Sequence, residues 1–234
     1  THVEWSTNEK VAVEIAATCA WAGKRSLCTM KMSGMNVAFD SMVGIAHSGV
    51  IGGMVVYVCD DPGVSAGMVE QDSRGFAVMA DTTVLEPGTV AETYEMVKYA
   101  FELSEQIQAP VFVRSVTNVA QSHAAVDVEE RVLPPDFAPK VKRDIAKYAK
   151  AGAAMCMAQH RDVIAALAKA DGIIRKDGLH QLSLAAKQGG LGIIAVGVAK
   201  CYVDEALAIA EAQGWPKQEV SILKSAGTLP YPQE

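Results

Sequence analysis

The sequence lacks several patterns that mark common functional classes. Its five cysteines form no Cys-x-x-Cys pair, which leaves no plausible ligand set for zinc or for an iron–sulfur cluster in this chain. It has no Walker phosphate loop, no Gly-x-Ser-x-Gly nucleophile motif, and no Gly-x-Gly-x-x-Gly motif after a strand. No apolar run approaches the roughly 20 residues of a membrane span. We therefore expect no membrane location, no metal bound by this chain alone, and none of the chemistries that these motifs support.

Positive charge is also scarce. The 234 residues carry 21 Lys and Arg against 27 Asp and Glu, a net charge of −6. Because nucleic acid is bound by basic surfaces, we do not expect it as a partner. Half of the residues are hydrophobic and 19 are glycine, which suits an α/β protein. The scattered cysteines lie in apolar contexts, which indicates buried, reduced thiols and a cytoplasmic protein.

Apolar patterning predicts alternating strands and helices. The expected helices are 6–23, 37–47, 70–81, 89–108, 139–170 and 202–213, and the expected strands are 25–30, 54–59, 82–85, 110–116, 191–198 and 220–223. Polar breaks are expected at 31–36 and 171–178. The alternation indicates an α/β fold with a doubly wound parallel sheet, followed by a second, smaller α/β unit.

The strand at 54–59 is the most informative segment. It is apolar throughout, as in strands buried on both faces of a parallel sheet, and it ends in Asp60 and Asp61. After a Pro-Gly turn, five polar residues follow: Glu70, Gln71, Asp72, Ser73 and Arg74. Since ligands of such sheets bind at the carboxyl ends of strands, this segment is a candidate site.

Each candidate has two interpretations. Asp60 and Asp61 are either an Asx turn with surface charge or acceptors that face a ligand or a partner chain. The polar run at 70–74 is either a helix start or a group that orients a substrate. Glu9 fits a capping box with Ser6, or it is a partly buried carboxylate that exchanges a proton with a ligand nitrogen.

Several segments together resemble one family. EWSTNEKVAVEIA at 4–16, TMKMSGMNVAFD at 29–40, DDPGVSAGMVEQDSR at 60–74 and ETYEMVKYAFELSE at 92–105 resemble the pyrimidine-binding domain of thiamine-diphosphate-dependent 2-oxoacid:ferredoxin oxidoreductases. The subgroup that the chain most resembles is the alpha subunit of the indolepyruvate type. ERVLPPDF at 130–137, LGIIAVGVAKCYVDEAL at 191–207 and VSILKSAGTLPYP at 220–232 resemble the transketolase-C-terminal-like domain that follows it.

The resemblance implies a division of the chain and a site. Residues 1–126 would be the pyrimidine-binding domain without its first part, 127–185 a linker and helical segment, and 186–234 part of the transketolase-C-terminal-like domain. Glu9 would bond the aminopyrimidine ring of the cofactor and promote deprotonation of its thiazolium carbon. The further cofactor-binding residues would be Lys31, Met32 and Asn36, and the residues that shape the cleft would be Asp60, Asp61, Glu70, Gln71, Asp72 and Arg74.

The implied reaction is oxidative decarboxylation of an aromatic 2-oxo acid. Coenzyme A would collect the acyl group, and electrons would pass through iron–sulfur clusters elsewhere in the complex to ferredoxin. Magnesium and the cofactor diphosphate would be held by another domain or chain, so we expect a portion of a longer protein or of a hetero- or homo-oligomer.

The chain also departs from the family pattern. Met32 stands where close relatives have histidine, and a loop that helps hold the substrate is absent. An NAD-linked phenylglyoxylate type, a non-oxidative thiamine-dependent enzyme and a catalytically silent subunit are the alternatives.

Overall fold

A computed structural model of the chain describes residues 2–128, 138–186, 190–215 and 219–232. Its larger sheet has four strands in the order β1-β2-β4-β3, and every described pairing in it is parallel. The strands are β1 (Ser26–Lys31), β2 (Met54–Asp60), β3 (Val84–Leu85) and β4 (Val111–Val116). This sheet confirms the predicted α/β fold.

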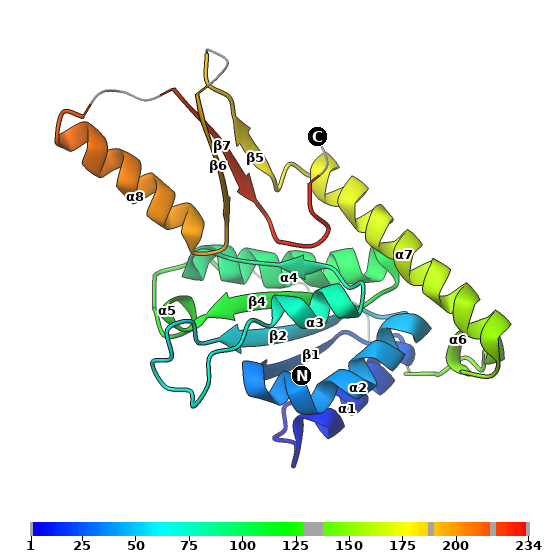
Figure 1. Cartoon of the computed structure of the whole chain (residues 1–234). Helices are drawn as coiled ribbons and strands as arrows, with labels where there is room; N and C mark the ends of the chain where they lie inside the picture. The colour runs from blue at the N-terminus through cyan, green and yellow to red at the C-terminus, as the bar shows by residue number, and fades with distance from the viewer. Residues whose placement is uncertain (1, 129–137, 187–189, 216–218, 233–234) are drawn as a thin grey trace.

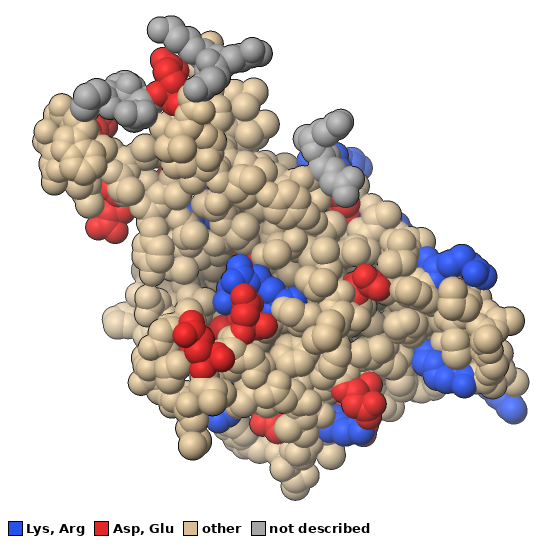
Figure 2. Space-filling view, in the orientation of Figure 1, with Lys and Arg blue, Asp and Glu red and all other residues tan. Residues whose placement is uncertain are grey.

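Helices cover both faces of this sheet (Figure 1). On one face lie α1 (Glu9–Trp21), α2 (Met32–Ser48) and the short α3 (Arg74–Met79); on the other lie α4 (Val90–Ile107) and α7 (Ala153–Lys176). Two short helices, α5 (Thr117–Ala120) and α6 (Ile145–Tyr148), complete the first unit. Figure 2 shows that Lys and Arg side chains gather over α6 and α7 on the face in view.

Strand β2 contributes side chains to the hydrophobic cores on both faces of the sheet. Met54, Val56 and Val58 pack with α1 and α2, while Val55 packs with α4 and α7 on the opposite face. Alternate residues of a strand point to opposite faces of its sheet, so a continuous apolar run buries both sides. The strand predicted at 54–59 is confirmed.

The second sheet is smaller and stands above the first in Figure 1. It contains β5 (Gln181–Ser183), β6 (Leu191–Val196) and β7 (Val220–Ser225), in the order β5-β7-β6, with α8 (Ala199–Ala212) beside it. β6 is parallel to β7, whereas β5 is antiparallel. The strand predicted at 191–198 is present as β6, but its apolar run does not mean burial on both faces, because Leu191 is 55% and Ile194 58% exposed.

Several predicted boundaries are also wrong. α2 begins at Met32, directly after β1, so there is no polar break at 31–36. α7 continues to Lys176 through the loop expected at 171–178, because Ala170 and Ile174, one helical turn apart, both pack in the second core. The helix expected from residue 70 begins only at Arg74.

Two further expectations are corrected or left open. Cys19 is exposed, so the five free cysteines are not all buried. The first part of the linker expected from residue 127 falls at 129–137, outside the described residues. Among the helices that the structure describes, none has the length and hydropathy to cross a membrane.

Candidate functional site

The carboxyl ends of the first sheet bring the candidate segments together. In the sheet register Lys31 of β1 pairs with Cys59, and Asp60 of β2 pairs with Val116 of β4. α2 starts immediately after β1, so its first turn lies at this same edge. The α1 residue Glu9 also reaches this turn, because its side chain lies against Gly34.

Glu9 does not belong to a capping box with Ser6. The residue that caps α1 is Asn8, whose Oδ1 accepts a hydrogen bond of 2.8 Å from the Lys10 backbone N–H. Glu9 is partly buried, and its carboxylate has no hydrogen bond or ion pair with any described residue. The capping interpretation is therefore wrong, and the carboxylate is free to accept a hydrogen bond from a ligand.

The Glu9 carboxylate affects the thiol of Cys28 in β1 electrostatically. Burial raises the pKa of the Cys28 thiol to about 11, and the charge of Glu9 makes a smaller contribution in the same direction. Since Cys28 is only 5% exposed, the thiol stays protonated and neutral at physiological pH. Cys28 therefore contributes a small, uncharged side chain near Glu9 and does not act as a nucleophile.

Asp61 organises the loop after β2 and is not free to bind a ligand. Its Oδ1 accepts the hydroxyls of Ser65 (2.6 Å) and Thr117 (2.7 Å), and its Oδ2 accepts the backbone N–H groups of Ala66 and Gly67, both at 2.7 Å. These four hydrogen bonds hold the pKa of Asp61 far below its usual range, and the bond from Ser65 has the largest effect. The Asx-turn interpretation is wrong, because the carboxylate accepts from backbone N–H groups five and six residues on and not two. The expectation of surface charge is also wrong, because Asp61 is 5% exposed.

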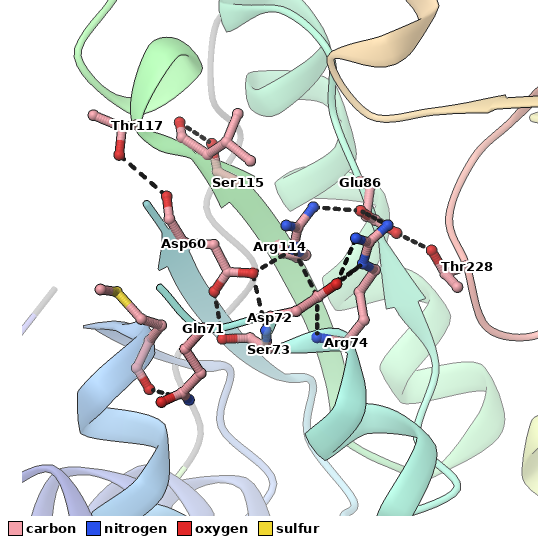
Figure 3. Close-up of polar contacts among 12 residues, drawn as sticks. Asp60, Gln71, Asp72, Ser73, Arg74, Glu86, Arg114, Ser115, Thr117 and Thr228 are labelled. Carbon is pink, nitrogen blue, oxygen red and sulfur yellow. Dashed lines mark hydrogen bonds and ion pairs between the residues drawn. The ribbon is translucent and has the colours of Figure 1, made fainter. Parts of the chain in front are cut away.

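Asp60 enters a buried charge network (Figure 3). Its Oδ1 accepts the Ser73 hydroxyl at 2.5 Å, and its Oδ2 accepts the Ser73 N–H at 2.9 Å and Nε of Arg114 at 2.6 Å. Nη1 of Arg114 reaches Oε2 of Glu86 at 2.8 Å. Asp60 and Glu86 are each 1% exposed, so Arg114 neutralises carboxylates that have almost no access to water.

The other residues of the polar run at 70–74 make three separate sets of contacts. Gln71 ties the loop to α2, because it donates to the Met32 carbonyl at 3.1 Å and accepts from the Asn36 side chain at 2.9 Å. Arg74 instead binds Asp72 through Nε and Nη2. Glu70 accepts a 3.2 Å hydrogen bond from the Gly63 N–H within the loop.

The predicted cofactor residues on α2 lie near this loop. Met32 is buried, and its Cε lies beneath Gly67, where a Cβ would come within 2.8 Å of it. Lys31 and Asn36 are exposed. The structure thus brings Met32, Asn36 and Gln71 together at the start of α2, and Glu9 reaches the same turn through Gly34. Asp60 and Asp61 point into the protein.

Three residues of the network escaped prediction: Glu86, Arg114 and Thr228. The Thr228 hydroxyl donates to Oε1 of Glu86, which connects the segment after β7 to the first unit. An arginine inside the apolar run PVFVRSV was the available signal, because a charged residue in a buried strand needs a partner of opposite charge. Nothing local identified Glu86 or Thr228.

No metal centre was expected in this chain. Within the described ranges, no group of three or more His, Cys, Asp or Glu side chains is arranged to hold a metal ion.

Comparison with known proteins identifies relatives over most of the chain. No protein-family model matches it. The indolepyruvate oxidoreductase subunit IorA of Pyrococcus abyssi is 36% identical over 99% of this chain and 35% of its own length. The corresponding subunit of Methanothermobacter marburgensis is 35% identical over 99% of this chain and 36% of its own length. The chain thus spans about one third of the length of these curated relatives.

A solved structure has the same fold. The 2-oxoglutarate:ferredoxin oxidoreductase from Magnetococcus marinus, with 2-oxoglutarate, coenzyme A and succinyl-CoA bound, matches with a TM-score of 0.75. The match covers 99% of this chain and 47% of that chain at 16% identity. At this identity the likeness concerns the fold. The subunit relatives confirm the resemblance drawn from the sequence, and the solved structure confirms the fold.

Proposed function

Because the chain belongs to the family of 2-oxoacid oxidoreductases that includes the IorA subunits, of which it matches about one third, we propose that it supplies the pyrimidine-binding side of a thiamine diphosphate site. The reaction would be oxidative decarboxylation of an aromatic 2-oxo acid of the indolepyruvate type. The observation that carries this proposal is the partly buried, unpaired carboxylate of Glu9 at the carboxyl edge of the sheet.

The residues at this edge fit the cofactor. Glu9 has no competing donor among the described residues, and Gly34 leaves room for its side chain. Bound thiamine diphosphate would supply the reactive carbon and the electron sink for decarboxylation, whereas the protein supplies orientation and proton control. Glu9 would accept a hydrogen bond from the aminopyrimidine ring and hold a proton at its carboxylate.

Neighbouring residues would shape the site without taking part in proton transfer. Buried Met32 offers an apolar surface at the start of α2, and exposed Lys31 and Asn36 offer polar groups. Gln71 fixes the loop after β2 on α2 through its two hydrogen bonds. We propose that this loop forms one wall of the cleft and that Asp61 maintains its shape.

The rest of the assembly would supply what these residues do not. We propose that 1–126 form the pyrimidine-binding domain, 127–185 a connecting helical segment and 186–234 part of a transketolase-C-terminal-like domain. Magnesium, the diphosphate site and the iron–sulfur clusters would belong to other domains or subunits. Coenzyme A would collect the acyl group and ferredoxin the electrons. The name of the structural neighbour, which includes ferredoxin and coenzyme A, supports the last two of these assignments.

Replacement of Glu9 tests the proposal. In the assembled enzyme, Glu9→Gln should lower the rate of 2-oxo acid oxidation by roughly 100-fold or more, because the amide cannot hold the proton. The control is Glu14→Gln on the same helix, an exposed residue that binds Ser41 and should leave the rate unchanged. Ferredoxin reduction, measured beside NAD reduction, identifies the acceptor. An unchanged rate in Glu9→Gln would reject the catalytic role and leave a structural one.

A further inference from the structure

Gly34 occupies an unusual place beside Glu9. It is the third residue of α2, and it is buried. An ideal Cβ at residue 34 would lie 2.6 Å from Cγ of Glu9, 3.0 Å from Oε1 and 3.1 Å from Cδ. These three nearest atoms all belong to one side chain. Non-bonded carbon atoms do not approach so closely, because their optimal separation is about 3.5–4.0 Å.

Backbone geometry does not explain this glycine. Positive φ angles are found at other glycines, such as Gly49 and Gly23, but not at Gly34. A glycine within a helix lowers its stability relative to alanine, so the position carries a cost. Gly44 lies in the same helix with open space around its missing Cβ. The contact with Glu9 therefore distinguishes Gly34 from Gly44.

From this contact we infer that Gly34 is a positioning residue: its missing side chain gives the Glu9 carboxylate its place at the cofactor site. The inference rests on the proposed role of Glu9. The Glu9 side chain is flexible, whereas the backbone of α2 is fixed by the helix. An added methyl group at residue 34 would therefore turn the carboxylate away without unfolding the chain.

A double-mutant cycle tests this inference. The variants are Gly34→Ala, Glu9→Ala and the two combined, with Gly44→Ala as the matched control in the same helix. Thiamine diphosphate binding is measured by calorimetry in the assembled enzyme with magnesium, and thermal unfolding is measured on the chain. Non-additive effects of the two substitutions measure their coupling.

Gly34→Ala should weaken thiamine diphosphate binding by roughly tenfold or more and lower kcat, while KM for the 2-oxo acid changes by less than about twofold. Gly44→Ala should bind as the unmodified protein does. With Glu9→Ala already present, Gly34→Ala should cause no further loss of binding. It should then raise the melting temperature as Gly44→Ala does, since the clash is gone.

The outcomes separate this inference from the proposed function. Equal effects of Gly34→Ala with and without Glu9→Ala would assign Gly34 to helix packing and overturn the positioning role, even where Glu9→Gln is inactive. If Glu9→Ala binds the cofactor and turns over normally while the coupling in thermal unfolding persists, the contact is real but the proposed function fails, and the positioning role at a cofactor site fails with it.

Discussion

Arg114 forms ion pairs with two carboxylates that are almost completely buried. Its side chain is 11% exposed, and it donates to Asp60 from Nε and to Glu86 from Nη1. A guanidinium suits this place because its planar fork offers several donors in a fixed geometry. Removal of one partner from a buried ion pair leaves an uncompensated charge, which costs far more than the pair contributes when intact.

Arg114→Met is therefore expected to be strongly destabilising. It leaves Asp60 and Glu86 without their shared cation, and the free energy of unfolding should fall by about 3–5 kcal/mol in urea denaturation. Arg25→Met is the control, because the Arg25–Glu105 pair is 49% and 37% exposed and should change stability by less than about 1 kcal/mol. Similar losses in the two variants would show that the buried network does not stabilise the fold.

At the scale of elements, periodicity identified what is local. The apolar run at 54–59 and the amphipathic helix from Thr89 could be predicted because burial repeats along the chain with a strand or helix period. The hydrogen-bond partners of Asp60 and Asp61 could not be predicted in this way. Neighbouring residues at the end of a strand point to opposite sides, so one carboxylate enters the charge network and the other the loop.

The site was predicted in part for the same reason. Glu9 was identified from a resemblance, while its local pattern indicated a helix cap that the structure assigns to Asn8. Arg114 and Glu86 are 28 residues apart in the sequence and meet only because β3 and β4 pair. Contacts that depend on strand pairing and chain crossings have no local signal.

The small sheet gives a pH-dependent prediction. Nδ1 of His180 accepts the Ala226 N–H at 3.2 Å, which requires the neutral ring. Burial lowers the pKa of His180, and two α7 residues face it with opposing effects, Asp171 raising and Arg175 lowering that pKa. The folded pKa thus lies below the unfolded value of about 6.5. As the pH falls below about 7, the unfolded chain binds more protons, and the free energy of unfolding should decrease.

The decrease should be smaller in His180→Asn, whose side-chain oxygen can accept the same N–H. His123→Asn is the control, because His123 is exposed. Urea denaturation between about pH 7 and pH 5 gives the slope for each protein. Parallel slopes for His180→Asn and the unmodified chain would mean that another group causes the pH dependence.

At the scale of the whole molecule, the segment after β7 joins the two sheets. The Glu86 N–H donates to the Ala226 carbonyl and the Val84 N–H to the Leu229 carbonyl, each at 2.8 Å. These bonds lay the segment along the short strand β3, antiparallel to Val84. Lys200 of α8 adds an ion pair of 2.8 Å with Glu92 of α4. Because backbone hydrogen bonds and an ion pair connect the two units, we expect the two units to unfold together.

Gly227 lies at the closest point of this junction. A Cβ there would be 1.9 Å from the Val84 carbonyl oxygen and 2.9 Å from its carbon, and a backbone group cannot rotate away as a side chain can. Gly227→Ala should therefore separate the segment from β3 and lower the free energy of unfolding by about 2–3 kcal/mol. Hydrogen exchange should quicken at the Val84 and Glu86 amides. Gly192→Ala in β6, where a Cβ meets open space, should change neither quantity. If exchange at Val84 and Glu86 stays as slow in Gly227→Ala as in Gly192→Ala, the two sheets are not held together by this segment.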